Sequence, residues 1–537
     1  MRMISRYLWL LLAGLHCVAQ NETQIRLSIR GDPKTFDPLL AADETSEPFR
    51  YITGGVLLRL NRSTHQMEPE LAESWTVSND GRRVEFVLRK GVRFSDGTAF
   101  DSADVAAQVK RVNDRSIRSG IADTFRSEKD EIKVDVKSPD RIALIFPSPI
   151  AGVLGLFDQL VIQSSRSKQP DRAFLGPYVL ADYKPGQFVL LRRNPEYWKK
   201  DKQGHRLPYT DTVRLDILAS RDVELSRFRD GELDVIDKVE PDVFERLRKQ
   251  MPSAMRDVGP SLDSEFLWFN QVPNSPLPAY KRRWFGSQRF RRAVSGAINR
   301  ADIARVVYRG FAHPAGAYVS ESNKAWWHSG LKPHAFDPNQ SVQSLREDGF
   351  RLTDGKLFDR EGNAVQFSLI TNSSSRSRTQ VAAMLQQDLS KIGIQLNIVP
   401  LEFGSLIERI TQTNDYEACL LGFTNVEPDP NTQVNVFLSS GNMHAWYPAE
   451  PAPATPWEAE IDQLIRKQAG APQNVRKQVF DRVQEILWRE APLIFLVHPN
   501  VLVAISPHLT NVAPSPLPPR FYWNLEQIRT SRTSTRK

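Results

Sequence analysis

The sequence is poor in cysteine and has no long apolar segment. It contains two cysteines in 537 residues, Cys17 and Cys419. Such a pair cannot build a disulfide framework, and Cys419 lies inside the apolar run of residues 418–421, as a small core residue would. No segment reaches the roughly 18 consecutive apolar residues that favour a transmembrane helix. These absences argue against a disulfide-stapled protein and against an integral membrane protein.

The short motifs of the large enzyme classes are also missing. The sequence has no G-x-S-x-G, H-E-x-x-H, Walker loop or C-x-x-C. His328 and His334 have the spacing His-x5-His, which one face of a helix does not present, so a surface loop is the simpler interpretation. We therefore predict that the protein is not an enzyme and has no cofactor and no metal site.

Charge is positive but unspecific. The formal net charge is +8 and the sequence pI is about 9.3. Nucleic-acid binding, attraction to an anionic membrane and simple solubility all fit such a balance. The 71 basic residues are scattered and nearly matched by 63 acidic ones. No nucleic-acid partner is predicted from charge.

The N-terminus has the pattern of a secretion signal. Arg2 and Arg6 precede a short apolar stretch at residues 7–15, and small residues at positions 17 and 19 favour cleavage after Ala19. We predict a signal peptide at residues 1–19 and a soluble, exported, periplasmic protein.

Cys17 offers an alternative, a lipoprotein signal with the lipid on that cysteine. A lipobox requires leucine and a small residue three and one positions before the cysteine, where this sequence has Gly14 and His16. Histidine at that position disfavours lipidation at Cys17.

The most informative stretch is residues 72–113, which reads as two strands, a turn and a helix. Asn79-Asp80-Gly81, which stands between apolar runs, has the residue types that favour a tight turn. Residues 83–89 alternate between polar and apolar, which is typical of a half-buried strand. Ser102 is the predicted N-cap of a helix whose valines fall on one face. Further along, strands alternate with helices, for example a helix through residues 381–392 followed by a strand at 394–398. This order predicts an α/β fold.

The segment AESWTVSNDGRRVEFVLRKGVRFSDGTAFDSADVAAQVKRVN resembles the hallmark segment of the family 5 extracellular solute-binding proteins, the peptide and nickel receptors of bacterial ABC importers. Other segments resemble the same family in the same order, across roughly residues 25 to 525: GPYVL, RNPEYW, RLPYTDTVRLDIL, GELDV, FRRAVSGAINRADIARVVYRGFAHPA, DLSKIGIQLNI and REAPLIFLV.

The resemblance implies a periplasmic-binding-protein-like fold with two α/β lobes, a hinge and an inserted subdomain. Its function would be to capture a peptide or similar small solute between the lobes, as a monomer, and to deliver it to the permease subunits of an ABC transporter. Crossings between lobes are expected near Trp268 and Pro499. The implied division is a first lobe at 20–60, 176–268 and 499–528, an inserted subdomain at 61–175, a second lobe at 269–498 and a disordered basic tail at 529–537.

The resemblance also places the ligand loop at residues 422–429. In peptide receptors of the family, this segment has a tryptophan and then an aspartate that pairs with the ammonium group of the peptide. Here Phe423 replaces the tryptophan, and Asn425 stands where the acid is expected. A neutral amide cannot make the charge-assisted bond that an enclosed ammonium requires. Glu427 or Asp429 is left to supply the counter-charge.

Four further residues are candidate ligand contacts. Arg376 and Arg378 follow a strand near the place where dipeptide receptors hold the peptide carboxylate. Trp446 and Tyr447 are candidate aromatic walls of the cleft. Each has an ordinary alternative, a solvated arginine in a loop or an aromatic residue of the core.

Two other functional classes and several ligands stay open. The same receptor fold occurs behind a DNA-binding helix-turn-helix in solute-sensing transcriptional regulators, but an export signal at the N-terminus disfavours that function. A secreted enzyme would need a reactive constellation. Among receptors of this fold, the ligand could also be a nickel chelate, haem or an oligosaccharide.

Overall fold

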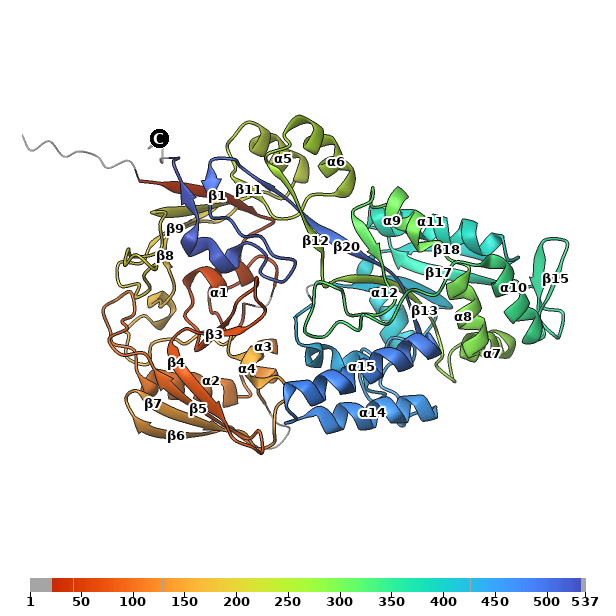
Figure 1. The fold of residues 1–537 in the computed structure, drawn as a ribbon, viewed down its shortest axis with the longest axis horizontal. Coiled ribbons are helices and arrows are strands. Elements are labelled where there is room, and N and C mark those ends of the chain that lie inside the picture. Colours follow the sequence, from red (N-terminus) through yellow and green to blue (C-terminus); the bar gives the residue numbers. More distant parts are fainter. Residues whose placement is uncertain (1–21, 42, 127–129, 425, 533–537) are drawn as a thin grey trace, which may run out of the picture.

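The computed structural model describes residues 22–41, 43–126, 130–424 and 426–532. Two lobes lie side by side, each built from strands with helices packed against them (Figure 1). The predicted α/β class and two-lobed organisation are confirmed. Within the described ranges, no helix combines the length and apolarity needed to cross a bilayer.

The first lobe has a four-stranded sheet in the order β1-β10-β9-β8. β1 (Gln24–Ile29) runs parallel to β10 (Thr212–Ile217), and β9 (Phe188–Arg193) and β8 (Tyr178–Lys184) continue antiparallel. Alternate residues of these strands are apolar and enter one core with α1 (Glu47–Thr53). The alternation seen in the sequence is therefore the inward face of this sheet.

A second sheet of the same lobe takes two of its strands from the hallmark segment. β4 (Ala72–Val77), β5 (Arg83–Leu88), β7 (Arg141–Ile145) and β6 (Lys133–Ser138) pair antiparallel in that order. α2 (Ser102–Asn113) packs its valines into the core beneath them. The short elements around this core are β2 (Leu58–Leu60), β3 (Met67–Pro69), α3 (Gly120–Asp123), α4 (Val153–Leu156) and η1 (Pro170–Arg172).

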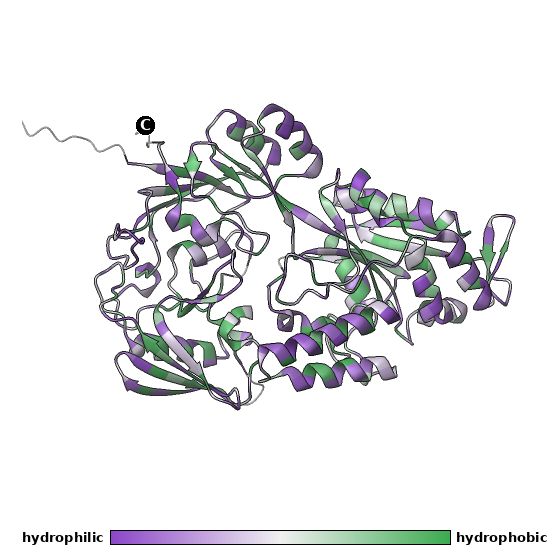
Figure 2. Ribbon diagram, viewed as in Figure 1, coloured by the Kyte–Doolittle hydropathy of each residue, from purple (hydrophilic) through white to green (hydrophobic). Residues whose placement is uncertain are grey.

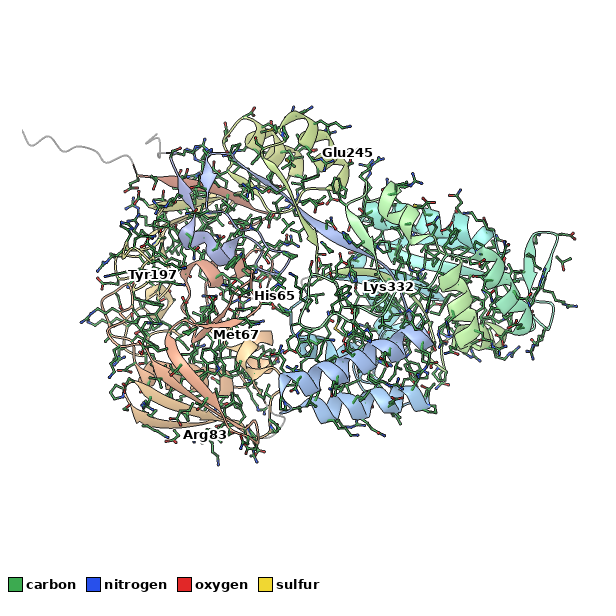
Figure 3. All side chains as sticks on the ribbon, in the orientation of Figure 1. His65, Met67, Arg83, Tyr197, Glu245 and Lys332 are labelled. Carbon is green, nitrogen blue, oxygen red and sulfur yellow. The ribbon has the colours of Figure 1, made fainter. Side chains whose placement is uncertain are left out.

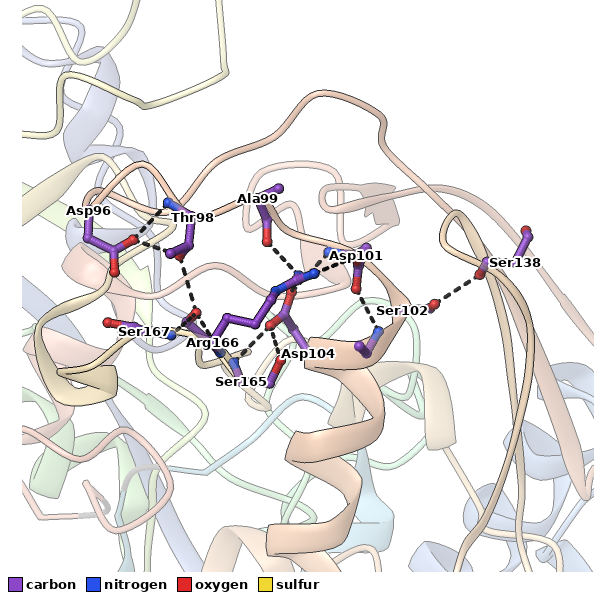
Figure 4. A network of polar contacts seen from close by, with 12 residues as sticks. Asp96, Thr98, Ala99, Asp101, Ser102, Asp104, Ser138, Ser165, Arg166 and Ser167 are labelled. Carbon is purple, nitrogen blue, oxygen red and sulfur yellow. Dashed lines mark hydrogen bonds and ion pairs between the residues drawn. The ribbon is translucent and has the colours of Figure 1, made fainter.

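A polar network fixes the start of α2 (Figure 4). The N-cap is Asp101, one residue before the predicted Ser102, and its carboxylate accepts from the amide of Ala103 at 2.8 Å. Asp101 and Asp104 form a capping box, which satisfies the first amides of the helix. Ser102 instead donates its hydroxyl to the carbonyl of Ser138 at 2.9 Å. Arg166 reaches both aspartates, at 2.7 and 2.8 Å.

One long strand joins the two lobes. β20 (Leu493–Ile505) pairs in its first half with β13 (Ser264–Phe269) and in its second half with β12 (Met255–Pro260). It also pairs with β11 (Val235–Ile236) and β14 (Ala312–Pro314). Figure 1 shows β12 and β20 crossing together from the first lobe into the second.

The second lobe continues this sheet in the order β20-β13-β19-β17-β18. β19 (Ala418–Phe423) pairs antiparallel with β13, whereas β17 (Gln366–Asn372) and β18 (Gln395–Leu401) are parallel neighbours. α11 (Arg376–Ser390) connects β17 to β18, and it buries Val381, Leu385 and Leu389 as the sequence predicts. In Figure 2 these strands are largely hydrophobic, and the helices around them carry hydrophilic residues.

The remaining elements lie around these sheets. The first lobe adds α5 (Arg221–Arg229), α6 (Pro241–Gln250), β21 (Leu509–Thr510), η4 (Tyr522–Gln527) and β22 (Arg529–Thr530). The second lobe adds α7 (Ala279–Gly286), α8 (Gln288–Gly296), α9 (Arg300–Val306), α10 (Pro338–Glu347), β15 (Arg351–Thr353), β16 (Lys356–Phe358), α12 (Phe403–Glu408), η2 (Arg409–Thr413), η3 (Pro430–Gln433), α13 (Val434–Phe437), α14 (Pro456–Gln468) and α15 (Gln473–Glu490).

The structure differs from the predicted disorder at the start of the basic tail. Residues 529–530 form β22, which pairs with β21. Arg532 donates to the buried carboxylate of Asp234 at 2.7 Å, and its carbonyl accepts from Gln24 in β1 at 3.0 Å. Backbone pairing and this ion pair order residues 529–532, although their basic, polar composition predicts a disordered tail. Residues 1–21, with the predicted signal peptide, and residues 533–537 lie outside the described part of the chain.

Candidate functional site

A cavity of about 680 Å³ lies between the two lobes. One wall comes from the β2–β3 hairpin, the β4–β5 turn and the segment 150–159 of the first lobe. The opposite wall comes from residues 323–326, 427–432, 470–473 and Arg476 of the second lobe. A volume of this size is typical of pockets that bind small organic molecules.

The first-lobe wall is largely apolar. His65, Met67 and Trp75 line it together with small and aliphatic residues of the segment 150–156. Figure 3 shows His65 and Met67 on the side of the first lobe that faces the second. His65 has φ of 60°, so it turns the tight β2–β3 connection in the left-handed region. This hairpin thereby brings its side chains to the cavity.

The lobes touch at two glycines. Gly152, at the start of α4 with φ of 67°, lies against the carboxylate of Asp429: a Cβ on Gly152 would come within 2.8 Å of the Asp429 Cγ. Gly81, in the β4–β5 turn, lies against Gly470 between α14 and α15, where an added Cβ would approach the Gly470 Cα to 3.0 Å. Side chains at these positions would hold the lobes apart.

Asp429 is held by an ion pair inside the second lobe. Arg476 of α15 donates two bonds to its carboxylate, at 2.8 and 2.6 Å. The Arg476 guanidinium also lies over the ring of Trp326, 4.9 Å from the centroid, and donates to Gln468 at 2.8 Å. Asp429 further caps the short helix η3 by accepting from the amide of Asn431. Its carboxylate is therefore engaged by the protein itself.

Glu427 is a different kind of acid. It lines the cavity from the second lobe, but the charged groups that act on it are Arg50 and Arg62 of the first lobe. Burial is the main cause that raises the pKa of Glu427 to about 7, and the negative charges of Glu47 and Asp158 also raise it. The positive charges of Arg62 and Arg50 lower it, but by less than burial raises it. A carboxyl group in this position changes its charge near neutral pH.

The arginines that face Glu427 belong to a cluster around Tyr51. Arg50, Arg59 and Arg62 lie over the Tyr51 ring, at 4.9, 5.8 and 5.7 Å from its centroid. Asp158 pairs with Arg62 at 2.7 Å and with Arg59 at 3.5 Å. Burial opposes ionisation of Asp158, but Arg62 and Arg59 outweigh it, so its pKa is lowered. The first lobe thus holds a buried, net positive cluster that acts on Glu427, and Asp158 is the member that lines the cavity.

The predicted arginine contacts lie elsewhere. Arg378 begins α11 instead of a loop and forms a two-pronged ion pair with Glu265 of β13, at 2.8 and 3.1 Å. Arg376 is 83 % exposed and reaches only Asp242 of α6, at 3.9 Å. Neither arginine lines the cavity.

The predicted aromatic contacts belong to the core. Trp446 is 1 % exposed and donates its indole N–H to Glu458 at 2.8 Å, so it is a core residue and not a cleft wall. Phe423 packs against Phe266 with tilted rings, whose centroids lie 4.5 Å apart, and Tyr447 packs against the same core. Asn425 lies outside the described residues. Of the predicted contacts that the structure describes, Glu427 and Asp429 line the cavity.

Sequence reasoning missed most of the first-lobe wall. Trp75 and Gly81 lie in the hallmark segment, yet their turn and strand pattern gives no sign that they face a cavity. The arginine cluster comes from α1, β2 and the turn after β2, which are distant in sequence from Glu427. A basic residue in an otherwise largely apolar helix, such as Arg50 of α1, is the one signal that could have indicated it.

Comparisons with known proteins identify this architecture. Residues 66–445 match the family described as bacterial extracellular solute-binding proteins, family 5. The chain belongs to this family. It is a solute-binding protein, which confirms the receptor function and the family that the sequence predicts.

Relatives of this family 5 protein share its fold at low identity. A probable ABC transporter-binding protein of Deinococcus radiodurans is 26% identical over 434 residues, 73% of this chain and 72% of the relative. The solved structure of NikA from Brucella suis with Fe(III)-EDTA is 20% identical, covers 95% of this chain and 100% of that chain, and has a TM-score of 0.78. AppA from Bacillus subtilis with a nonapeptide is 20% identical, covers 96% and 100%, and has a TM-score of 0.69.

Proposed function

We propose that the protein is the substrate-binding receptor of an ABC importer, which encloses a peptide between its lobes and presents it to the membrane permease. The observation that carries the proposal is the cavity of about 680 Å³ with walls from both lobes. A solute that contacts both walls binds the closed arrangement better than an open one, and so shifts the population toward closure. The permease would then recognise the closed, solute-bound conformation.

A peptide with a free amino terminus is the ligand we put first, and Glu427 is its proposed anchor. Asp429 lines the same cavity, but Arg476 already takes both of its oxygens. The remaining predicted contacts, Phe423, Asn425, Arg376, Arg378, Trp446 and Tyr447, are not part of this proposal. A nickel chelate, haem or an oligosaccharide is the alternative ligand for the same cavity, and the NikA structure holds a metal chelate.

The proposed hinge consists of two crossings between the lobes. Residues 261–263 connect β12 to β13, and β20 passes from one lobe to the other near residue 499. The amide of Ser261 donates to the carbonyl of Pro499 at 2.8 Å, so the two crossings are bonded to each other. Trp268 lies further along, on β13, in the core of the second lobe. We place the first lobe before residue 261 and after residue 499, and the second lobe between residues 261 and 499. The inserted subdomain at 61–175 belongs to the first lobe.

We further propose that binding is not followed by chemistry and that the protein acts as a monomer without a nucleic-acid partner. The cavity wall contains acids, one histidine and Arg476, and the described residues bring no hydroxyl into hydrogen-bond contact with the His65 ring; the Ser78 hydroxyl donates to Asp80 within its own turn. A solute-sensing transcriptional regulator is the alternative from another class. Recovery of a chemically altered solute after incubation with the protein would contradict the receptor proposal.

Native mass spectrometry of gently purified protein is expected to detect one bound molecule, and its mass identifies the solute class. Removing that solute and adding it back should lower the radius of gyration in small-angle scattering, because the ligand bridges both lobes. It should also raise the melting temperature, since it binds the native state alone. A tightly bound solute that leaves the scattering curve unchanged would refute closure between the lobes.

We also propose export to the periplasm, with a mature chain that begins at Gln20. The positive residues at 2 and 6, the apolar stretch and the cleavage pattern ending at Ala19 support this. N-terminal sequencing of protein from the soluble periplasmic fraction is expected to start at Gln20. Incorporation of a palmitate analogue at Cys17 would instead establish the lipoprotein alternative.

A further inference from the structure

A buried cluster of one histidine and two glutamates lies in the second lobe, outside the cavity. His444 and Glu450 come from the segment between α13 and α14, and Glu458 comes from the first turn of α14. The three side chains are 0, 1 and 4 % exposed. One ligand atom from each, a ring nitrogen or a carboxylate oxygen, lies within 4.8 Å of the others. None of the three lines the solute cavity.

The histidine is oriented as a metal ligand is. Its Nδ1 lies 3.0 Å from the carbonyl oxygen of Val436, an acceptor, so Nδ1 carries the proton and donates. The lone pair is then on Nε2, which is buried and has no hydrogen-bond partner. A ring N–H held by a backbone carbonyl, with the other nitrogen free, is the usual outer-shell arrangement of a metal-binding histidine.

Glu450 is the second unpartnered group. Both of its carboxylate oxygens are buried and have no hydrogen-bond partner of good geometry. The His444 Nε2 lies 3.9 Å from Glu450 Oε2 and 3.7 Å from Glu458 Oε1, which is too long for a hydrogen bond. A lone pair and two carboxylates that face one another in the core repel, and a cation between them removes that repulsion.

Glu458 is positioned by neighbours that leave it able to bind. Trp446 donates its indole N–H to Oε1 at 2.8 Å, and Thr455 donates its hydroxyl to Oε2 at 2.6 Å. These bonds fix the carboxylate while each oxygen keeps a second lone pair. Trp446, a candidate cleft aromatic in the sequence, therefore positions a member of this cluster.

We propose that His444, Glu450 and Glu458 bind one Zn²⁺ ion. Ligands of a tetrahedral zinc ion with bonds of 2.0–2.2 Å lie about 3.4 Å apart, so the observed separations of 3.7 and 3.9 Å need a contraction of about half an ångström. The imidazole nitrogen favours zinc over Ca²⁺ and Mg²⁺, which prefer oxygen ligands. A water molecule can supply the fourth ligand. The proposal departs from the absence of a metal that the sequence predicts.

The ion would join two segments of the second lobe. The segment with His444 and Glu450 is a compact loop, closed by bonds from Ala449 to the Gly441 carbonyl at 2.8 Å and from Glu450 to the Ser439 carbonyl at 3.0 Å. Glu458 ties this loop to α14. Zinc is therefore expected to stabilise the second lobe, independently of solute binding.

The test uses the mature full-length protein without an affinity tag, treated with EDTA and then titrated with Zn²⁺ against a chromophoric chelator. We expect one equivalent to bind and the melting temperature to rise. X-ray absorption at the zinc edge should give one nitrogen and two or more oxygens near 2.0–2.2 Å. Sulfur at about 2.3 Å would place the ion at Cys419 and overturn the proposal.

Two matched variants separate ligation from folding. Glu450→Gln is isosteric and should weaken zinc binding by more than about 100-fold, because loss of even an outer-shell partner costs 10–100-fold. Glu224→Gln changes an equally buried carboxylate of the first lobe, whose oxygens are bonded to Ser28 and Arg221, and this variant should bind zinc like wild type. If wild type takes up no zinc, or if Glu450→Gln takes it up equally well, the cluster is an imidazole–carboxylate contact and the proposal is wrong. Small-angle scattering with the solute distinguishes this failure from failure of the receptor function.

Discussion

Replacing Glu427 with glutamine is expected to weaken binding of a peptide with a free amino terminus by about 2–5 kcal/mol, or roughly 30- to 5,000-fold. The peptide ammonium would lose its charged partner in a closed cavity, and Asp429 cannot substitute because Arg476 holds it. Calorimetry with one peptide and its N-acetylated form measures the effect. Acetylation should weaken binding to wild type strongly and to Glu427→Gln only slightly, because the two changes remove the same interaction.

The pH dependence gives this prediction a second readout. The pKa of Glu427 is raised to about 7 in the folded protein, so its neutral form is favoured. Its contribution to the stability of the ligand-free protein is fully present below the unfolded pKa and is lost as the pH rises through 7. An ammonium ligand needs the charged form, so its affinity should rise over the same range. Glu427→Gln should show neither trend.

Two outcomes would contradict the Glu427 assignment. Equal affinity of wild type and Glu427→Gln would mean that the anchored end of the ligand is neutral or lies elsewhere. Tighter binding to Glu427→Gln would mean that Glu427 competes with an anionic ligand for Arg50 and Arg62. Asp429→Asn is the stability control: it should lower the melting temperature, because Arg476 loses the negative charge and one of its two acceptor oxygens.

Gly152→Ala is expected to prevent closure of the lobes. A Cβ at this position would overlap the Asp429 carboxylate of the second lobe, 2.8 Å from its Cγ. If the closed arrangement falls to about one molecule in a hundred, the apparent dissociation constant rises about 100-fold. Calorimetry measures this loss, and small-angle scattering should show a larger radius of gyration than wild type at the same solute concentration.

Gly97→Ala is the matched control for backbone strain. Gly97 has φ of 85° and Gly152 has φ of 67°, so alanine is strained at both, but nothing lies within 4 Å of a Cβ at Gly97. Both variants should therefore lose a similar amount of stability, about 1–2 kcal/mol. Only Gly152→Ala should lose affinity. Equal affinities of the two variants would show that the contact between Gly152 and Asp429 has no part in closure.

The sequence predicts the fold well because its signals are local. The alternation in β5, the valine face of α2 and the helix–strand order around α11 each follow from neighbouring residues. The N-cap of α2 differs by one residue because Asp101 and Asp104 form a capping box, which competes with Ser102 as the cap. The tail prediction differs because an ion pair with Asp234, about 300 residues earlier, holds Arg532.

The cavity is harder to predict because its residues meet only in three dimensions. Glu427 and Asp429 stand two residues apart and look equivalent in sequence, yet one faces first-lobe arginines and the other is held by Arg476. Trp446 looks like a cleft aromatic, and its actual partner, Glu458, is twelve residues away in another element. The sequence pattern shows that a charged or aromatic side chain is present, but it does not show which residue that side chain contacts in the folded protein.

The path of the chain has a consequence for the order of folding. Gln24 of β1 donates its amide to the carbonyl of Arg532, and Thr210 donates to the carbonyl of Ile528, so a segment that is synthesised after the whole second lobe bonds to the first lobe. The second lobe, by contrast, takes its strands from one continuous stretch, up to the first half of β20. During synthesis and export, the second lobe has all of its strands before the first lobe does. The lobe that begins the chain is therefore the last to become complete.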